Sequence, residues 1–376
     1  MNKSPVIFDE VTCLNDKKIG LITLNVPEKL NALSLPMIQL MLPKMKAWQC
    51  DNQIALVIIQ GVGDRAFCAG GDIVSLYSDM VENPEQYTPQ IESFFTQEYQ
   101  LDYLIHTYQK PCLVWGSGFV MGGGVGLMVG ASHKVVTETT KIAMPEIAIG
   151  LYPDVGASWF LSHMPENIGL FMGMTGAMIN AADAKQLDLA THFVLEEQQL
   201  NILDALVAVS WGDTVALNHE KLSTVLGEFE RHSVFKMPSS LLREHQSIIN
   251  DVMNKDNVVD IAQAIIDLES ESEWIKKAQH SLSQGSPYSA HIVYRQLIEA
   301  KNLSLADCFR LELNLSLRCA QNGEFSEGVR ALLVDKDKAP KWQCKSVSEV
   351  RAETMDWFFE PIFSATEHPL RDLGIN

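Results

Sequence analysis

The stretches Ala-Phe-Cys-Ala-Gly-Gly-Asp at residues 66–72 and Met-Gly-Gly-Gly-Val-Gly at residues 121–126 decide the fold of this chain. Each follows an apolar run and precedes a helical pattern, so each predicts a glycine turn between a strand and a helix. The first amides of a helix have no partner within it and can bind an anion. Two such turns meeting at one carbonyl oxygen would form an oxyanion hole. Alternatively, the glycines only permit a helix to pack closely on a sheet.

Strand and helix patterns alternate on both sides of these turns. Apolar residues recur at helical spacing from Ser34, the expected cap, to Trp48, with Pro36 near the first turn. The other expected elements are strands at 18–25, 55–60, 111–115 and 133–138 and a small-residue helix at 122–130. Such alternation indicates an α/β domain with parallel strands.

Beyond Ser158 the strand signal largely disappears, and the pattern predicts helices with turn breaks. Residues 196–277 are rich in Glu, Asp, Ser and Asn and carry helical apolar stripes. We therefore expect two regions, a core at residues 1–195 and a helical region at 196–376.

The bulk composition is that of a metabolic enzyme. The chain has 376 residues, 47% of them apolar, and a formal charge of −18. The negative charge disfavours binding to nucleic acid or to an anionic membrane, and no apolar run is long enough for a membrane span. The N-terminus lacks a secretory pattern, which predicts a cytoplasmic protein.

Cysteine, histidine and serine patterns exclude several kinds of site. The seven cysteines show no paired spacing and the ten histidines no metal-ligand spacing, so we expect neither a disulfide framework nor a metal site. Cys68 in the first glycine turn is interpreted as a buried small residue rather than a nucleophile. Ser158 lacks the glycine-flanked elbow of a serine hydrolase.

Several further short motifs match the sequence pattern of one known protein family. They are Asn31-Ala32-Leu33, Pro145-Glu146, Pro153-Asp154-Val155-Gly156, Thr175-Gly176, Glu327-Gly328-Val329-Arg330-Ala331 and Lys336-Asp337-Lys338. With the two glycine turns, they make the chain resemble the crotonase (enoyl-CoA hydratase/isomerase) superfamily, most of all its 3-hydroxyisobutyryl-CoA hydrolases. The resemblance implies a spiral of ββα turns followed by a helical region that completes a coenzyme A pocket. It also implies an acyl-CoA substrate, with no separate cofactor and no metal.

The resemblance assigns the catalytic groups. It implies that the backbone N–H groups of Gly71 and Gly123 polarise the thioester carbonyl, and that Glu146 and Asp154 do the acid and base work. Two neighbouring carboxyl groups disfavour simultaneous ionisation, so one can serve as acid and the other as base. The alternative for Glu146 is a helix cap or an ion pair with an arginine.

Two positions favour hydrolysis over hydration. Hydratases similar to this chain carry a second glutamate where Gly126 stands, and commonly a glycine where Asp154 stands. The resemblance therefore implies hydrolysis of a short β-hydroxyacyl-CoA, with 3-hydroxyisobutyryl-CoA of valine breakdown first. Glu146 would either attack the carbonyl to form an anhydride or activate water. An isomerase or hydratase of unsaturated acyl-CoA and a catalytically silent acyl-CoA-binding relative are the alternatives.

Remaining candidates concern substrate binding and assembly. Glu98 matches a substrate-contacting position and, if ionised, would accept a hydrogen bond from the substrate hydroxyl; a solvated helix glutamate is the alternative. A homo-oligomer is left open, because the helical region could cover the surface used by trimeric relatives. The candidates for binding the coenzyme A phosphates, each otherwise an ordinary surface charge, are Lys29, Arg65, Lys336, Lys338 and Lys341.

Overall fold

The chain forms two compact units that interleave along the sequence. The structure is a computed structural model that describes residues 4–165 and 167–375. The first unit comprises Met1–Gly71, Leu104–Ile142 and Ile179–Arg243, and the second comprises Asp72–Tyr103, Ala143–Met178 and Glu244–Asn376. Each unit is made of three separate segments, so these units do not test a division at a single point of the chain. The division into 1–195 and 196–376 stays a prediction.

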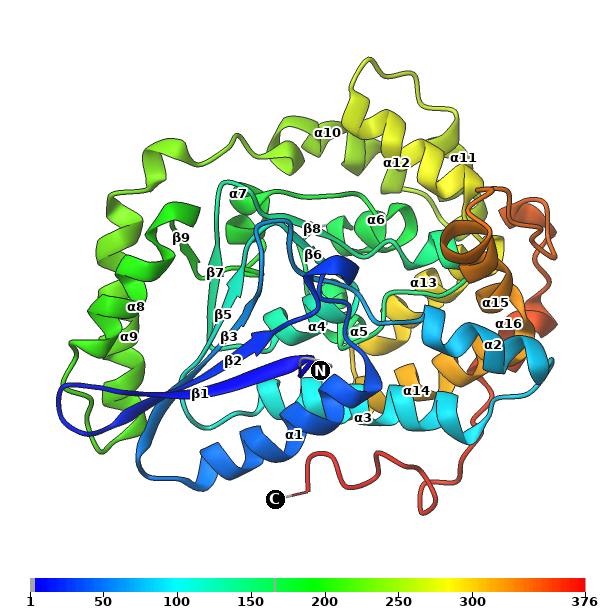
Figure 1. The fold of residues 1–376 in the computed structure, drawn as a ribbon. Coiled ribbons are helices and arrows are strands. Elements are labelled where there is room, and N and C mark those ends of the chain that lie inside the picture. Colours follow the sequence, from blue (N-terminus) through cyan, green and yellow to red (C-terminus); the bar gives the residue numbers. More distant parts are fainter. Residues whose placement is uncertain (1–3, 166, 376) are drawn as a thin grey trace. The chain divides into compact units, whose positions relative to one another are not determined.

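A six-stranded sheet organises the first unit (Figure 1). In spatial order its strands are β1 (Val6–Thr12), β2 (Lys18–Leu24), β3 (Ile54–Gly61), β5 (Cys112–Gly116), β7 (His133–Val136) and β9 (His192–Phe193). β1 is antiparallel to β2, and each later neighbouring pair is parallel, which confirms the α/β prediction. β9 was missed by the sequence, because two residues are too few to show a period.

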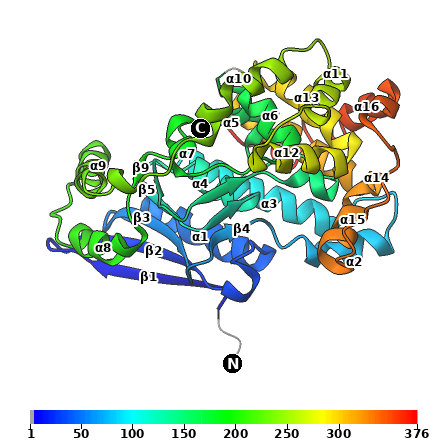
Figure 2. The same cartoon turned by 90° about the horizontal axis from the view of Figure 1, so that it is seen from above.

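Helices cover both faces of this sheet (Figures 1 and 2). They are α1 (Leu35–Cys50) on one face and α8 (Gln199–Val207) and α9 (Val215–Arg231) on the other. In strand β2, successive residues point to opposite faces of the sheet, so both faces can be covered. Ile19 and Leu21 join the apolar core beneath α8 and α9. Gly20 lies under α1, where an added Cβ would be 2.7 Å from the Trp48 ring.

A second, three-stranded sheet carries the glycine turns. Its strands, in spatial order, are β4 (Ala66–Ala69), β6 (Phe119–Met121) and β8 (Lys141–Ala143). β4 and β6 are parallel, and Ala69 lies opposite Met121. The short helix α4 (Gly123–Val129) starts directly after β6 and is buried over nearly its whole length. The carboxyl ends of β4 and β6 therefore lie at one edge of the sheet.

The second unit is mostly helical, as the sequence predicted for the C-terminal region. Its helices include α2 (Val74–Glu82), α3 (Pro89–His106), α5 (Ala157–Ser162), α6 (Ile168–Thr175), α10 (Leu241–Met253), α11 (Val258–Ile266), α12 (Glu273–Gln284), α13 (Pro287–Ala300), α14 (Leu305–Asn322), α15 (Glu324–Val329) and α16 (Ala352–Phe359). α3 and α10 extend into the first unit. α13 packs against α5 and α6, and α14 against α15 and α16.

Local signals explain where several of these helices begin. The side chains of Ser286 and Ser304 accept hydrogen bonds from the backbone N–H groups of Ser289 and Asp307, and so cap α13 and α14. Pro287 occupies the first position of α13, where its missing N–H costs nothing. Among the described residues, no helix combines the length and the apolar character needed to cross a bilayer.

Candidate active site

The two glycine turns lie next to each other in the first unit. Because Ala69 and Met121 are paired, Gly70-Gly71 and Gly122-Gly123 leave neighbouring strands at the same edge. Gly70 has φ +109° and Gly122 φ +46°, which side chains with a Cβ rarely adopt. Gly123 starts α4, so its N–H has no partner within the helix. The structure thus brings Gly71 and Gly123 together, and their role as an oxyanion hole stays a prediction.

Close packing also explains one of the glycines. A Cβ added to Gly124 would lie 2.2 Å from the Cys68 carbonyl oxygen, so α4 rests directly on β4. Cys68 itself is fully buried beneath the turn, in agreement with its interpretation as a packing residue. Close packing therefore accounts for Gly124, whereas the oxyanion-hole role of Gly71 and Gly123 stays a prediction.

Glu146 is a buried carboxyl with an unpartnered oxygen. It begins the 3-10 helix η2 (Glu146–Ile149) after β8, and the residue is 5% exposed. Oε2 has no hydrogen-bond partner among the described residues. Burial raises the pKa of Glu146 well above its usual range, and repulsion from Asp154 raises it further. Among the described residues, no arginine contributes to this shift or forms an ion pair with Glu146, which counts against the ion-pair alternative.

Asp154 lies in a strained loop. The preceding turn ends at Gly150 (φ +67°), and the loop continues through Val155 (φ +52°) and Gly156 (φ +91°). A β-branched residue in the left-handed region is unusual and is found mostly at functional sites. The Asp154 carboxylate accepts a hydrogen bond from the Tyr99 hydroxyl (2.7 Å). Burial raises the pKa of Asp154 to about 6, and the Tyr99 hydrogen bond opposes that increase.

Glu312 and Gln296 hold this loop in place. Glu312, in α14, accepts hydrogen bonds from the N–H groups of Gly156 and Ser158, each at 2.8 Å. Gln296, in α13, donates to the Pro153 carbonyl and to Ser158 Oγ, both at 2.7 Å. Burial raises the pKa of Glu312 to about 8, although these hydrogen bonds lower it. The loop that presents Asp154 is therefore fixed by buried side chains from two later helices.

Glu98 belongs to the same group of acids. It lies in α3 and is 2% exposed, so the alternative of a solvated helix glutamate is wrong. Burial raises the pKa of Glu98 well above its usual range, and the charges of Asp154 and Glu146 add to the increase. A protonated Glu98 can donate as well as accept a hydrogen bond. For Glu98 to accept the hydrogen bond of the substrate hydroxyl as a carboxylate, another group must stabilise its negative charge.

Five acidic side chains thus form what we call the buried acid cluster of the second unit. Its members are Glu98, Asp102, Glu146, Asp154 and Glu312. Each contributes to, or is subject to, the pKa shift of another member. Such clustered, desolvated carboxyl groups are typical of acid and base chemistry.

The candidate phosphate-binding residues lie on both units. Arg65 donates to the Pro27 carbonyl (3.0 Å) and lines a cavity of about 200 Å³ together with residues that flank Lys29. In the second unit, Lys336, Lys338 and Lys341 are exposed. Lys336 and Lys338 have φ of +60° and +55° in the loop that follows α15. Their role with coenzyme A stays a prediction.

Other candidate chemistries find no support. The seven cysteines are free thiols. Among the described residues, no group of three or more His, Cys, Asp or Glu side chains could hold a metal ion. Ser158 is buried, and its hydroxyl accepts from Gln296, which accounts for it as a structural residue.

Sequence reasoning missed the supporting residues of the site. These are Tyr99, Asp102, Tyr152, Gln296, Glu312 and Ser316. Only one signal pointed to any of them. Asp102 and Glu312 are acids on apolar stretches of helix, at positions that the periodicity places inside. The pairing of α14 with the Asp154 loop joins residues more than 150 positions apart.

Comparison with known proteins identifies the class. A family model described as enoyl-CoA hydratase/isomerase matches residues 19–359. The structure is similar to a carnitinyl-CoA dehydratase from Mycobacterium thermoresistibile, with a TM-score of 0.83, 30% identity and coverage of 96% and 97% of the two chains. An enoyl-CoA hydratase from Rhodobacter sphaeroides gives a TM-score of 0.81, 30% identity and coverage of 96% and 98%. The chain belongs to the enoyl-CoA hydratase/isomerase family and has the crotonase fold.

Curated sequences narrow the comparison within this family. The mitochondrial 3-hydroxyisobutyryl-CoA hydrolase of Gallus gallus is 36% identical over 91% of this chain and 86% of its own length. The mitochondrial enzyme of the same name from Homo sapiens is 35% identical over 97% of this chain and 92% of its own length. The names of these relatives place them in mitochondria. That finding contradicts the cytoplasmic location expected from the N-terminus, because such a pattern-based inference cannot outweigh relatives that match nearly the whole chain.

Proposed function

We propose that this protein hydrolyses a short β-hydroxyacyl-CoA thioester, with 3-hydroxyisobutyryl-CoA as the first choice. One observation carries the proposal. Glu146 and Asp154 lie in a buried cluster of acids, in a chain that matches nearly the full length of relatives named as hydrolases of that thioester. Family membership alone does not carry it, because the similar solved structures are named for hydration and dehydration.

The pKa shifts suggest how the two carboxyl groups divide the work. Burial and the charge of Asp154 raise the pKa of Glu146 well above its usual range, so the proposal places the proton of the resting pair on Glu146 and the charge on Asp154. In the proposed reaction, Asp154 takes the proton from Glu146, and the Glu146 carboxylate then attacks the thioester carbon or activates a water molecule. The departing thiolate takes the proton from Asp154. In the anhydride route, water then cleaves the anhydride, which releases the hydroxy acid and leaves Glu146 protonated. In the direct route, Glu146 has already taken its proton from the attacking water, so by either route the pair ends in its starting state.

The remaining roles follow the family resemblance. The proposal assigns polarisation of the thioester carbonyl to the N–H groups of Gly71 and Gly123. Glu98 contacts the hydroxyl of the acyl group. Coenzyme A is part of the substrate, and the reaction belongs to valine breakdown. Whether the protein forms a homo-oligomer stays open, and analytical ultracentrifugation would decide the question.

A thiol-release assay tests the reaction. The purified protein should release free coenzyme A from 3-hydroxyisobutyryl-CoA, detected with a thiol-reactive chromophore. In parallel, crotonyl-CoA should show no loss of enoyl absorbance. Absorbance loss without thiol release would replace hydrolysis by hydration, the alternative favoured by the names of the solved structures. Binding of either thioester without any turnover would indicate a silent relative.

Two extensions sharpen the assay. A panel that includes 3-hydroxypropionyl-CoA measures the contribution of the methyl group, for which about 10-fold to 200-fold discrimination is expected in an apolar pocket. A single turnover in ¹⁸O-labelled water separates the two routes. Label found in Glu146 would establish the anhydride route, with water attacking the Glu146 carbonyl of the anhydride. Direct water attack labels only the product.

A further inference from the structure

Asp102 is the member of the buried acid cluster that no assigned role explains. Its side chain is fully buried, and neither Oδ1 nor Oδ2 has a hydrogen-bond partner among the described residues. An unpartnered buried polar group destabilises the folded state, so its presence needs an explanation. Asp102 lies four residues after Glu98 in α3, which puts both side chains on the same face of the helix.

Acidic groups from three elements face Asp102. They are Glu98 from its own helix, Asp154 from the loop after η2 and Glu312 from α14, and each of these charges raises the pKa of Asp102 further above the value imposed by burial. Two tyrosine hydroxyl groups bond to other members of the cluster. Tyr99 donates to Asp154, and Tyr152 donates to the Glu312 carbonyl at 2.5 Å. Among the described residues, no donor binds either oxygen of Asp102, and no cation contributes to its pKa shift, so the neutral acid is the stable form.

We propose that Asp102 is a positioning residue whose protonated carboxyl donates a hydrogen bond to Glu98, so that Glu98 accepts a hydrogen bond from the hydroxyl of the substrate. This inference rests on the proposed function, because it concerns how the same site recognises a β-hydroxyacyl group. Asp102 keeps its proton throughout and acts only through Glu98. It thereby selects hydroxylated over plain acyl chains.

The geometry suits such a pair. Side chains at positions i and i+4 of a helix have Cβ atoms about 5–6 Å apart, within reach of a carboxyl-to-carboxyl hydrogen bond. Asp102 and Glu98 are not hydrogen-bonded to each other in this structure, and hydrogen bonds in active sites often tighten only when the substrate binds. A donor from a neutral acid to a carboxylate is among the stronger hydrogen bonds, so it can offset the burial of one charge on Glu98.

Two variants with the same branching at Cγ separate the donor from the titratable group. Asp102→Asn keeps a donor but cannot ionise, whereas Asp102→Leu removes both properties. The probes are analogues of 3-hydroxyisobutyryl-CoA and isobutyryl-CoA in which a methylene group replaces the thioester sulfur. Calorimetry gives the Kd of each analogue, and no turnover is needed.

The expected result is selective. Asp102→Asn should bind both analogues within about threefold of the unmodified protein. Asp102→Leu should weaken the hydroxylated analogue by about 10-fold to 100-fold, the range for loss of a hydrogen bond to a charged group, and leave the other analogue unchanged. A merely structural defect would weaken both analogues alike, and that result, or equal binding by both variants, would overturn the proposal.

An infrared measurement provides a second test that does not depend on how the leucine variant folds. The difference spectrum between the unmodified protein and Asp102→Asn at neutral pH should contain the carbonyl stretch of a protonated carboxyl group. A carboxylate band in its place would show that Asp102 is ionised and would overturn the proposal. Failure of the thiol-release assay with these binding and infrared results intact would count against hydrolysis, and not against the role of Asp102.

Discussion

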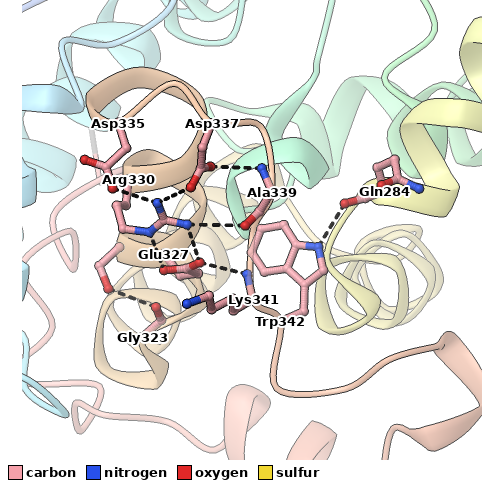
Figure 3. Close-up of polar contacts among 10 residues, drawn as sticks. Gln284, Gly323, Glu327, Arg330, Asp335, Asp337, Ala339, Lys341 and Trp342 are labelled. Carbon is pink, nitrogen blue, oxygen red and sulfur yellow. Dashed lines mark hydrogen bonds and ion pairs between the residues drawn. The ribbon is translucent and has the colours of Figure 1, made fainter.

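The second unit contains two groups of acidic side chains that differ in burial, in the presence of a cation and in the direction of their pKa shifts. In the buried acid cluster, the side chains form no ion pair with any described cation, and burial raises their pKa values. The other group surrounds Arg330 near the surface (Figure 3). Arg330 binds both oxygens of Glu327, at 2.8 and 2.9 Å, and contacts Asp335 and Asp337, each at 2.7 Å.

The partners decide which group can do chemistry. Hydrogen bonding to Arg330 lowers the pKa of Glu327, and that of Asp337 is lowered by the Ala339 N–H and by Arg330. Acids held in the charged form by a permanent cation do not exchange protons near neutral pH. The Arg330 group instead fixes the backbone after α15, where Lys341 N–H also binds Glu327 (2.7 Å). Burial without a cation is thus the feature that the proposed catalytic acids share and the acids around Arg330 lack.

The largest expected effect is that of Glu146→Gln. The amide keeps the volume but removes the acid and base function, so kcat should fall by roughly 10²-fold to 10⁴-fold while acyl-CoA still binds. Steady-state thiol release and calorimetric binding are the measurements. Glu327→Gln in the Arg330 group is the matched control, and its kcat should change little. Turnover close to that of the unmodified protein in Glu146→Gln would remove the distinction between the two groups.

Asp154→Asn should come next. Without a proton acceptor for Glu146, kcat should fall by about 10²-fold, near the lower end of the range for a positioned acid or base. The pH dependence of kcat should also change, because the group whose pKa is about 6 is gone. If the variant changes KM alone, Asp154 would be a binding residue, and only Glu146 would remain as the chemical group.

Glu146 and Asp154, and the turns of Gly71 and Gly123, could be proposed as site residues from the sequence because they lie in short contiguous motifs. The strands and the capped helices could be predicted for a similar reason, because hydrophobic periodicity and capping residues are local features of the sequence. Glu312 could not be found, because its function depends on a helix that folds back on a loop far away in the sequence. The absence of hydrogen-bond partners at Asp102 is likewise a property of packing, which no local pattern encodes.

Glu312→Gln tests the support of the Asp154 loop. Glutamine has one acceptor oxygen where Glu312 uses two, so the N–H of either Gly156 or Ser158 would lose its partner. A buried unpartnered donor costs about 1–3 kcal/mol of stability, and kcat should fall by about 10-fold as Asp154 moves. Urea unfolding and thiol release measure the two effects. A stable variant with full activity would show that the loop holds its shape without α14.

The pH dependence of stability should have opposite signs for the two groups. The folded-state pKa values of Asp154, about 6, and Glu312, about 8, exceed their unfolded values, so the folded state binds more protons. Their stabilisation is therefore complete below about pH 4 and is lost as the pH rises through 6 and 8. Each extra proton corresponds to a slope of about −1.4 kcal/mol per pH unit. The lowered pKa of Glu327 acts oppositely, and its stabilisation is lost as the pH falls through the folded-state value. Urea unfolding from pH 4 to pH 9 measures the curve, and a stability that rises from pH 5 to pH 8 would contradict the raised values.

The smallest expected effect is that of Arg330→Met. Methionine keeps part of the apolar stem but leaves Glu327, Asp335 and Asp337 without their guanidinium, so the three acids repel one another. Because the group is near the surface, we expect a small decrease in Tm that largely disappears in high salt, where the repulsion is screened. The kcat for thiol release should stay unchanged, in contrast to each substitution in the buried acid cluster. A large loss of kcat would mean that the backbone after α15, with Lys336 and Lys338, contributes to the active site. The same substitution would then show that an acid group neutralised by a cation also serves catalysis, by holding that segment in place.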